Sequence, residues 1–102
     1  MSRLLTDEEI TRQLEALQGW SRDGDELRAT YKATTFAEGI EFVRLVAADA
    51  DQMNHHPDIQ ISYTTIAWSL STHSEGGVTQ LDIELAHHIV EAAAQTGAQV
   101  GA

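Results

Sequence analysis

Residues 59–70 alternate apolar and polar side chains, but the alternation changes phase partway along. The apolar residues hold odd positions at first and even positions afterwards: Ile59, Ile61 and Tyr63, then Ile66, Trp68 and Leu70. A strand cannot transfer its apolar side chains to the opposite face unless a turn intervenes. We therefore expect two short antiparallel strands here, joined by a tight turn near Thr64 and Thr65.

A second hairpin is predicted between residues 19 and 33. Its turn is the pair Asp23-Gly24, which favours the left-handed conformations of tight hairpin turns. Trp20 lies before the turn, and apolar residues alternate after it: Leu27, Ala29 and Tyr31. The two segments together predict four strands.

Three helices are predicted by one repeated start signal, in which a threonine N-cap is followed three residues later by an acid, as in a capping box. The pairs are Thr6 with Glu9, Thr35 with Glu38, and Thr79 with Asp82. We expect the first helix to end near Leu17 and the second near Asn54. Apolar residues recur at helical spacing: Ile10, Leu14 and Leu17 in the first helix; Phe36, Ile40, Val43, Ala47 and Ala50 in the second; Leu81, Leu85, Ile89 and Ala93 in the third.

The predicted elements follow the order α-β-β-α-β-β-α within a single domain of residues 1–94, and residues 95–102 are expected to fray. This order predicts an α+β fold with two layers, in which a four-stranded antiparallel sheet carries three helices on one face. The other face of the sheet, or an edge strand, would then be free to meet a second copy of the chain.

The net charge of the chain disfavours two classes of binding partner. Six basic and 16 acidic side chains give a formal net charge of −10, which opposes binding to nucleic acids and anionic lipid surfaces. No apolar run reaches the ~18 residues of a membrane span, and the first residues do not resemble a secretory leader. We therefore expect a cytoplasmic protein with neither nucleic acid nor a membrane as partner. The chain has no cysteine, which excludes disulfides and cysteine-ligated metal centres.

Three histidines are placed where they can do acid–base chemistry. Asp51 and His55 are four residues apart, so on a helix they would share one face, and the carboxylate would orient the imidazole and stabilise its cation. Pro57 ends the helix and turns His56 in another direction. His73 follows the fourth strand, and a tight hairpin returns that end of the strand close to the start of the third. We expect the three imidazoles to converge, although each histidine taken alone could simply cap a helix end.

A metal site is the alternative for these side chains, because histidine and aspartate are ligands of zinc and iron. Adjacent histidines followed by proline are not a usual chelating spacing, however, and the sequence lacks the H-E-x-x-H motif. It also lacks phosphate-binding loops and a G-x-S-x-G nucleophile elbow. Nucleophilic hydrolysis and nucleotide binding therefore have no support in the sequence, and metal-dependent chemistry stays open as an alternative to acid–base chemistry by the histidines.

Several of these residues stand in one fixed pattern, an acid, three residues, His-His-Pro, an aromatic residue, a histidine and an aspartate. Here they are Asp51, His55-His56-Pro57, Tyr63, His73 and Asp82. The pattern resembles the signature of the pterin-4a-carbinolamine dehydratases, and the similarity covers about residues 6–94. Matching segments surround it: Trp20, Met53-Asn54, Leu70-Ser71-Thr72 and Gly76-Gly77-Val78-Thr79. Three positions depart from the family pattern: Asp51, where glutamate is common; Ile59, often aromatic; and Ser74, where an acid is usual.

The resemblance implies a hydro-lyase that converts a 4a-hydroxytetrahydropterin to the quinonoid dihydropterin and water, as part of tetrahydrobiopterin recycling. It implies acid–base roles for His55 and His73, with Asp51 orienting His55. His56 would bind the pterin or share the proton transfer.

The same resemblance implies that Pro57, Tyr63 and Trp20 help to bind the pterin, that no metal or organic cofactor is needed, and that the chain forms a homodimer or homotetramer. The alternative is a module on this fold that assembles proteins or serves as a transcriptional cofactor without catalysis. The complete set of three histidines favours the enzyme.

Overall fold

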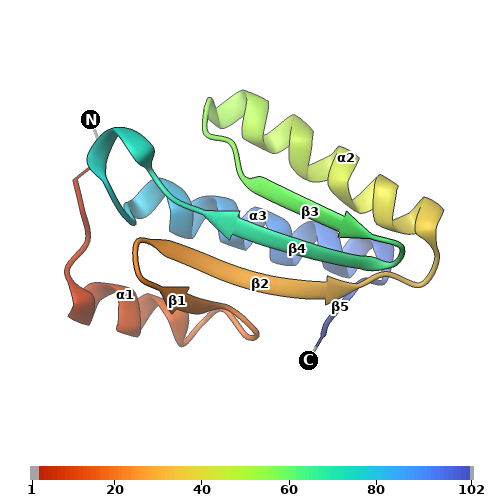
Figure 1. Cartoon of the computed structure of the whole chain (residues 1–102), viewed down its shortest axis with the longest axis horizontal. Coiled ribbons are helices and arrows are strands. Elements are labelled where there is room, and N and C mark those ends of the chain that lie inside the picture. Colours follow the sequence, from red (N-terminus) through yellow and green to blue (C-terminus); the bar gives the residue numbers. More distant parts are fainter. Residues whose placement is uncertain (1–2, 102) are drawn as a thin grey trace.

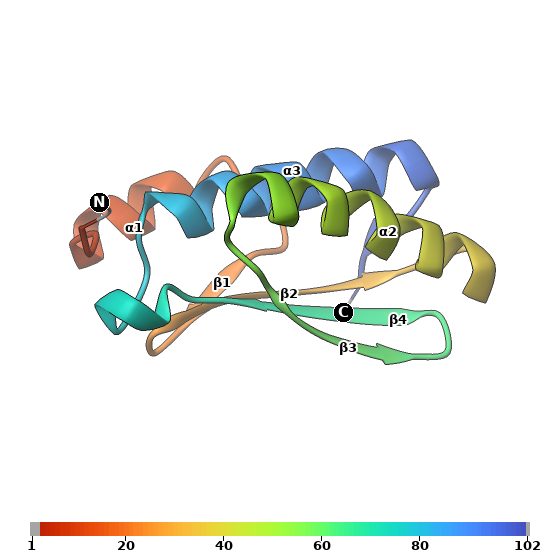
Figure 2. The same cartoon turned by 90° about the horizontal axis from the view of Figure 1, so that it is seen from above.

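The computed structural model describes residues 3–101 as two layers, a sheet and three helices (Figure 1). Figure 2 shows that the helices all lie on the same side of the sheet and leave its other face open. The elements in chain order are α1 (Asp7–Leu14), β1 (Ser21–Asp23), β2 (Glu26–Lys32), α2 (Phe36–Met53), β3 (Asp58–Ser62), β4 (Thr65–Leu70), a 3₁₀ helix η1 (His73–Glu75), α3 (Gln80–Thr96) and β5 (Gln99–Val100). The predicted α+β fold with an antiparallel sheet is confirmed.

The sheet follows the order β1-β2-β4-β3, and all neighbouring strands are antiparallel. The change of phase is confirmed, because Ile59 pairs with Trp68 and Ile61 pairs with Ile66. The turn between these strands consists of residues 63 and 64, and Tyr63 adopts a left-handed φ of 53° there. The other predicted turn is also present, with Gly24 at a φ of 63°.

The predicted helix starts are confirmed, and two of them are complete capping boxes. The side chains of Thr6 and Glu9 bond each other's backbone amides, and Thr79 and Asp82 do the same. The first helix ends three residues earlier than expected, at Leu14, because the next residues tighten into turns with i to i−3 hydrogen bonds. These turns still bury Leu17.

The apolar face predicted for α2 was right at Ala50 and in part at Val43, but wrong at Phe36, Ile40 and Ala47. Its side chains Phe36 and Ile40 are 51% and 41% exposed. The helix instead turns a neighbouring stripe towards the sheet: Gly39, Phe42, Val46 and Ala50. A Cβ atom on Gly39 would lie 3.3 Å from Ile66 Cδ1, so the glycine allows the helix to approach the sheet closely. Within residues 3–101, no helix combines the length and the apolar character needed to cross a bilayer.

Most of residues 95–101, where fraying was expected, lie in regular secondary structure. Helix α3 continues to Thr96, and Gly97 then reverses the chain with a φ of 78°. Strand β5 pairs with the end of β2, and the amide of Gly101 donates to the carbonyl of Thr30 at 2.8 Å. Strand β1 covers only the first part of β2, so β5 satisfies backbone groups that β1 leaves unpaired.

Phe42 lies at the centre of the core, with its ring centroid 5.3 Å from that of Tyr31 and 5.2 Å from that of Trp68. Phe42→Ala is expected to lower the free energy of unfolding by about 3–5 kcal/mol, because the ring is fully buried and its removal leaves a cavity. Phe36→Ala, on the exposed side of the same helix, is the matched control and should cost about 1 kcal/mol or less. Urea denaturation measures both, and similar losses would contradict the burial described here.

Candidate active site

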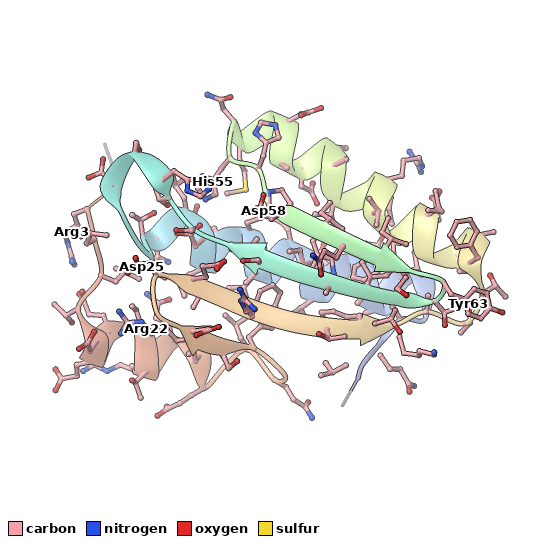
Figure 3. The ribbon with its side chains drawn as sticks, viewed as in Figure 1. Arg3, Arg22, Asp25, His55, Asp58 and Tyr63 are labelled. Carbon is pink, nitrogen blue, oxygen red and sulfur yellow. The ribbon has the colours of Figure 1, made fainter. Side chains whose placement is uncertain are left out.

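The segments that carry the three histidines leave the sheet at the same end. Asp58 of β3 pairs with Ser69 of β4, so the residues just before Asp58 and those just after Leu70 emerge side by side. Figure 3 shows His55 and Asp58 at this end of the hairpin. The fold therefore brings residues 55–57 and 71–73 to one end of the molecule.

His55 is buried beside a carboxylate from a different part of the chain. Its Nε2 atom lies 2.6 Å from Oδ1 of Asp82, in the first turn of α3, and the Asp82 side chain is fully buried. The separation of 27 residues hides this pair from any local reading of the sequence. Asp82 was predicted only as a helix cap, which it is, and its contact with His55 was missed.

The predicted pairing of Asp51 with His55 was wrong. Asn54 takes a left-handed conformation with φ 52° and ψ 42° and ends α2, so His55 does not lie one helical turn beyond Asp51. Asp51 instead meets the neighbouring histidine, with its Oδ1 atom 2.9 Å from Nε2 of His56. Both of these side chains are largely exposed, so this contact stabilises the fold less than the buried contact of His55 with Asp82.

The partners of Asp82 determine which nitrogen of His55 carries the proton. Its Oδ2 atom accepts from the backbone amide of Thr79 at 2.9 Å and from the hydroxyl of Thr72 at 2.8 Å. Two donors on one oxygen stabilise the ionised carboxylate, which can only accept at Oδ1 as well. His55 therefore donates from Nε2, and its Nδ1 atom is the basic nitrogen.

His73 begins the 3₁₀ helix η1 and is exposed. The pKa of Glu26, the first residue of β2, is lowered mainly by the hydrogen bond from Ser69 and by Arg28. The charge that His73 can carry lowers it further, so His73 lies near enough to Glu26 to interact with it. Thr72 directly precedes His73, and its side chain donates to the buried carboxylate of Asp82. Thr72 is therefore the residue that links His73 to the buried group around Asp82.

A hollow of about 300 Å³ lies on the open face of the sheet, next to this end. Its polar lining includes carboxylates, a guanidinium, hydroxyls and an amide: Glu26, Arg28, Thr30, Asp58, Gln60 and Ser69. Asp58 follows His56 by two residues, and Ser69 precedes His73 by four. The hollow therefore lies close along the chain to the segments that carry the histidines, but no histidine lines it.

The structure does not bring Tyr63 or Trp20 to the histidines. Tyr63 forms the turn at the opposite end of β3 and is 75% exposed; Figure 3 shows it far from His55. Trp20 is buried in the core, where its indole N–H donates to the hydroxyl of Tyr31 at 3.0 Å. Pro57 does lie at the histidine end, between His56 and β3.

Residues 3–101 contain no group of three or more histidine, aspartate and glutamate side chains arranged to hold a metal ion. His55 and His56 each place Nε2 against a different carboxylate. Such carboxylate–imidazole pairs fix the tautomer and orientation of the ring, which general acid–base chemistry requires.

Comparison with known proteins identifies the family to which this chain is similar. The family model described as pterin 4 alpha carbinolamine dehydratase matches residues 3–92. A protein of Mycobacteroides abscessus, provisionally named pterin-4-alpha-carbinolamine dehydratase, is 48% identical over 86 residues, which are 84% of this chain and 92% of the relative. A protein of Sulfolobus acidocaldarius with the same name is 47% identical over 85 residues, 83% of this chain and 93% of the relative.

Two solved structures resemble the fold. A Brucella melitensis protein described as a transcriptional coactivator/pterin dehydratase has a TM-score of 0.85 at 33% identity, covering 87% of this chain and 97% of the other. A pterin dehydratase-like protein described as a RuBisCO assembly factor in the alpha-carboxysome has a TM-score of 0.60 at 17% identity, covering 72% and 86%. The second likeness concerns the fold alone.

Proposed function

Because the chain belongs to the pterin-4a-carbinolamine dehydratase family, we propose that it converts a 4a-hydroxytetrahydropterin to the quinonoid dihydropterin and water. The observation that carries the proposal is the buried pair of His55 and Asp82, at the end of the hairpin where His56 and His73 also emerge. The reaction must remove a proton from N5 of the pterin and give one to the hydroxyl at C4a, and imidazoles can do both near neutral pH.

We assign the base to His55 and the acid to His73. The Nε2–H of His55 is committed to Asp82, so Nδ1 accepts the N5 proton. The electron pair of the N5–H bond becomes the double bond between N5 and C4a while the C4a–O bond breaks. His73 gives the departing hydroxyl the proton with which it leaves as water. Proton exchange with solvent restores both rings, so the reaction has no net demand for protons.

We assign the binding of the pterin ring to His56 and Pro57, which follow His55 directly in the chain. The hollow on the open face of the sheet, which is lined by Asp58 but by none of the histidines, offers carboxylate acceptors and the Arg28 guanidinium for the polar edge of a pterin. Trp20 is left out of this assignment, because its only polar hydrogen is already bonded in the core. The homodimer or homotetramer stays a prediction.

The test is to generate the carbinolamine in situ and follow its dehydration by stopped-flow absorbance. Wild-type protein should exceed the spontaneous rate, and His73→Ala should lower kcat by about 10²-fold, the lower end of what one general acid contributes. His87→Ala, on the exposed side of α3, is the matched control and should keep the wild-type rate. Wild-type protein that leaves the spontaneous rate unchanged would refute the enzyme and favour a non-catalytic module on this fold.

A further inference from the structure

Thr72 is a buried residue whose hydroxyl lies between two partners that belong to the first turn of α3. Its Oγ1 atom is 2.8 Å from Asp82 Oδ2 and 2.8 Å from Thr79 Oγ1. The N-cap threonine, Thr79, also accepts from the backbone amide of Leu81 at 3.2 Å. All three side chains of this network, those of Thr72, Thr79 and Asp82, are buried.

The number of available protons determines which group donates and which accepts in each hydrogen bond of this network. An ionised carboxylate can only accept, so the one hydroxyl proton of Thr72 is directed to Asp82. Thr72 must then accept from the hydroxyl of Thr79, whose own oxygen accepts from the amide of Leu81. Each hydroxyl in the series thus donates its one proton towards Asp82 and accepts from the donor before it. The series ends on the carboxylate that receives the Nε2–H of His55.

The backbone of the same residue closes the turn that carries the second catalytic histidine. The amide of Thr72 donates to the carbonyl of Gly77 at 2.8 Å. Its carbonyl accepts from the amides of Glu75 and Gly76, both at 3.0 Å. These bonds enclose His73 in a short loop anchored at Thr72, so one residue holds the carboxylate partner of His55 with its side chain and the loop of His73 with its backbone.

From this double attachment we propose that Thr72 is a positioning residue for the dehydration, one that sets the orientation of His55 relative to His73 without touching the substrate. The inference rests on the proposed function for its kinetic consequence. Without the hydroxyl, Asp82 Oδ2 keeps only the amide of Thr79, so the carboxylate can rotate and release His55. The buried hydroxyl of Thr79 also loses its acceptor.

Thr72→Val removes the hydroxyl at nearly constant volume and leaves the backbone bonds of the loop intact. We expect kcat to fall about tenfold, the effect of one buried hydrogen bond, with KM changed less than about twofold. Thr72→Ser restores the hydroxyl and should recover kcat to within about twofold of wild type. Thr64→Val is the matched control, because Thr64 is equally buried and its hydroxyl has no partner within residues 3–101; its kcat should equal that of wild type.

A second measurement separates a positioning role from a loss of stability, and from failure of the proposed function. Nitrogen-15 NMR of the imidazoles should show a single Nε2–H tautomer for His55 in wild type, Thr72→Ser and Thr64→Val, and a mixture of tautomers in Thr72→Val. This readout needs no substrate, so it tests Thr72 even if wild-type protein does not dehydrate the carbinolamine. An unchanged tautomer in Thr72→Val would overturn the inference, as would a wild-type kcat in that variant or no recovery in Thr72→Ser.

Discussion

Asp82→Asn is expected to lower kcat for dehydration by about 10²–10⁴-fold while the protein stays folded. The amide of Thr79 and the hydroxyl of Thr72 both donate to Oδ2, so the asparagine must place its carbonyl oxygen there. Its NH₂ group then faces His55 and donates to Nε2, which moves the ring proton to Nδ1. His55 would present an N–H, rather than a basic nitrogen, to N5 of the pterin.

Stopped-flow absorbance gives kcat for this variant, and near-ultraviolet circular dichroism shows whether the fold is kept. Asp49→Asn is the matched control, because it makes the same chemical change on α2. The only charged partner of Asp49 within residues 3–101 is His88, whose Nδ1 atom lies 3.5 Å from Oδ2. Asp49→Asn should keep wild-type kcat. A value within about twofold of wild type for Asp82→Asn would contradict the assignment of His55 as the base.

His55→Ala is expected to damage both catalysis and stability. The loss of the base should lower kcat by about 10²–10⁴-fold. The variant also leaves the Asp82 carboxylate buried without its imidazole partner, which should reduce the free energy of unfolding by about 3–5 kcal/mol. Activity is measured under conditions where circular dichroism shows folded protein, so that the two losses are separated.

His56→Ala is the natural comparison, because it removes the same side chain one residue later. The His56 and Asp51 side chains, which contact each other, are 58% and 79% exposed, so the free energy of unfolding should change by no more than about 1 kcal/mol. The assignment of His56 to substrate binding predicts a higher KM for this variant. Equal losses in the free energy of unfolding for the two alanine variants would show that the buried contact of His55 with Asp82 stabilises the fold no more than the exposed contact of His56 with Asp51.

The sequence predicted the fold where the signals are local. The change of phase between Ile61 and Ile66 required a turn, and the threonine caps marked each helix start. The face predicted for α2, wrong in part, shows the limit of such signals: this helix carries two apolar stripes, and periodicity cannot choose between them. Packing determines which stripe is buried: the stripe that contains Gly39 faces the sheet, because the glycine lets the helix approach Ile66 closely.

The candidate site was predicted only in part, for a related reason. The i to i+4 rule applies while the helix continues, and it failed for Asp51 and His55 because Asn54 ends the helix. The sequence itself predicted the end of this helix near Asn54, and the structure confirms that end. The spacing rule was therefore applied one residue beyond the helix that it requires. The contact between His55 and Asp82 depends on how α3 packs against the end of the hairpin, and no local spacing contains that information.

The short strand β5 has a practical consequence for how the protein can be labelled. It extends the sheet beside β2, whereas the histidines flank β3 and β4 on the other side. The Val100 side chain packs against Gly19, two residues before β1, so β1 and β5 lie along the same edge of β2. A fluorescent tag or carrier protein attached beyond Gly101 must therefore leave the sheet at the edge that bears no catalytic side chain.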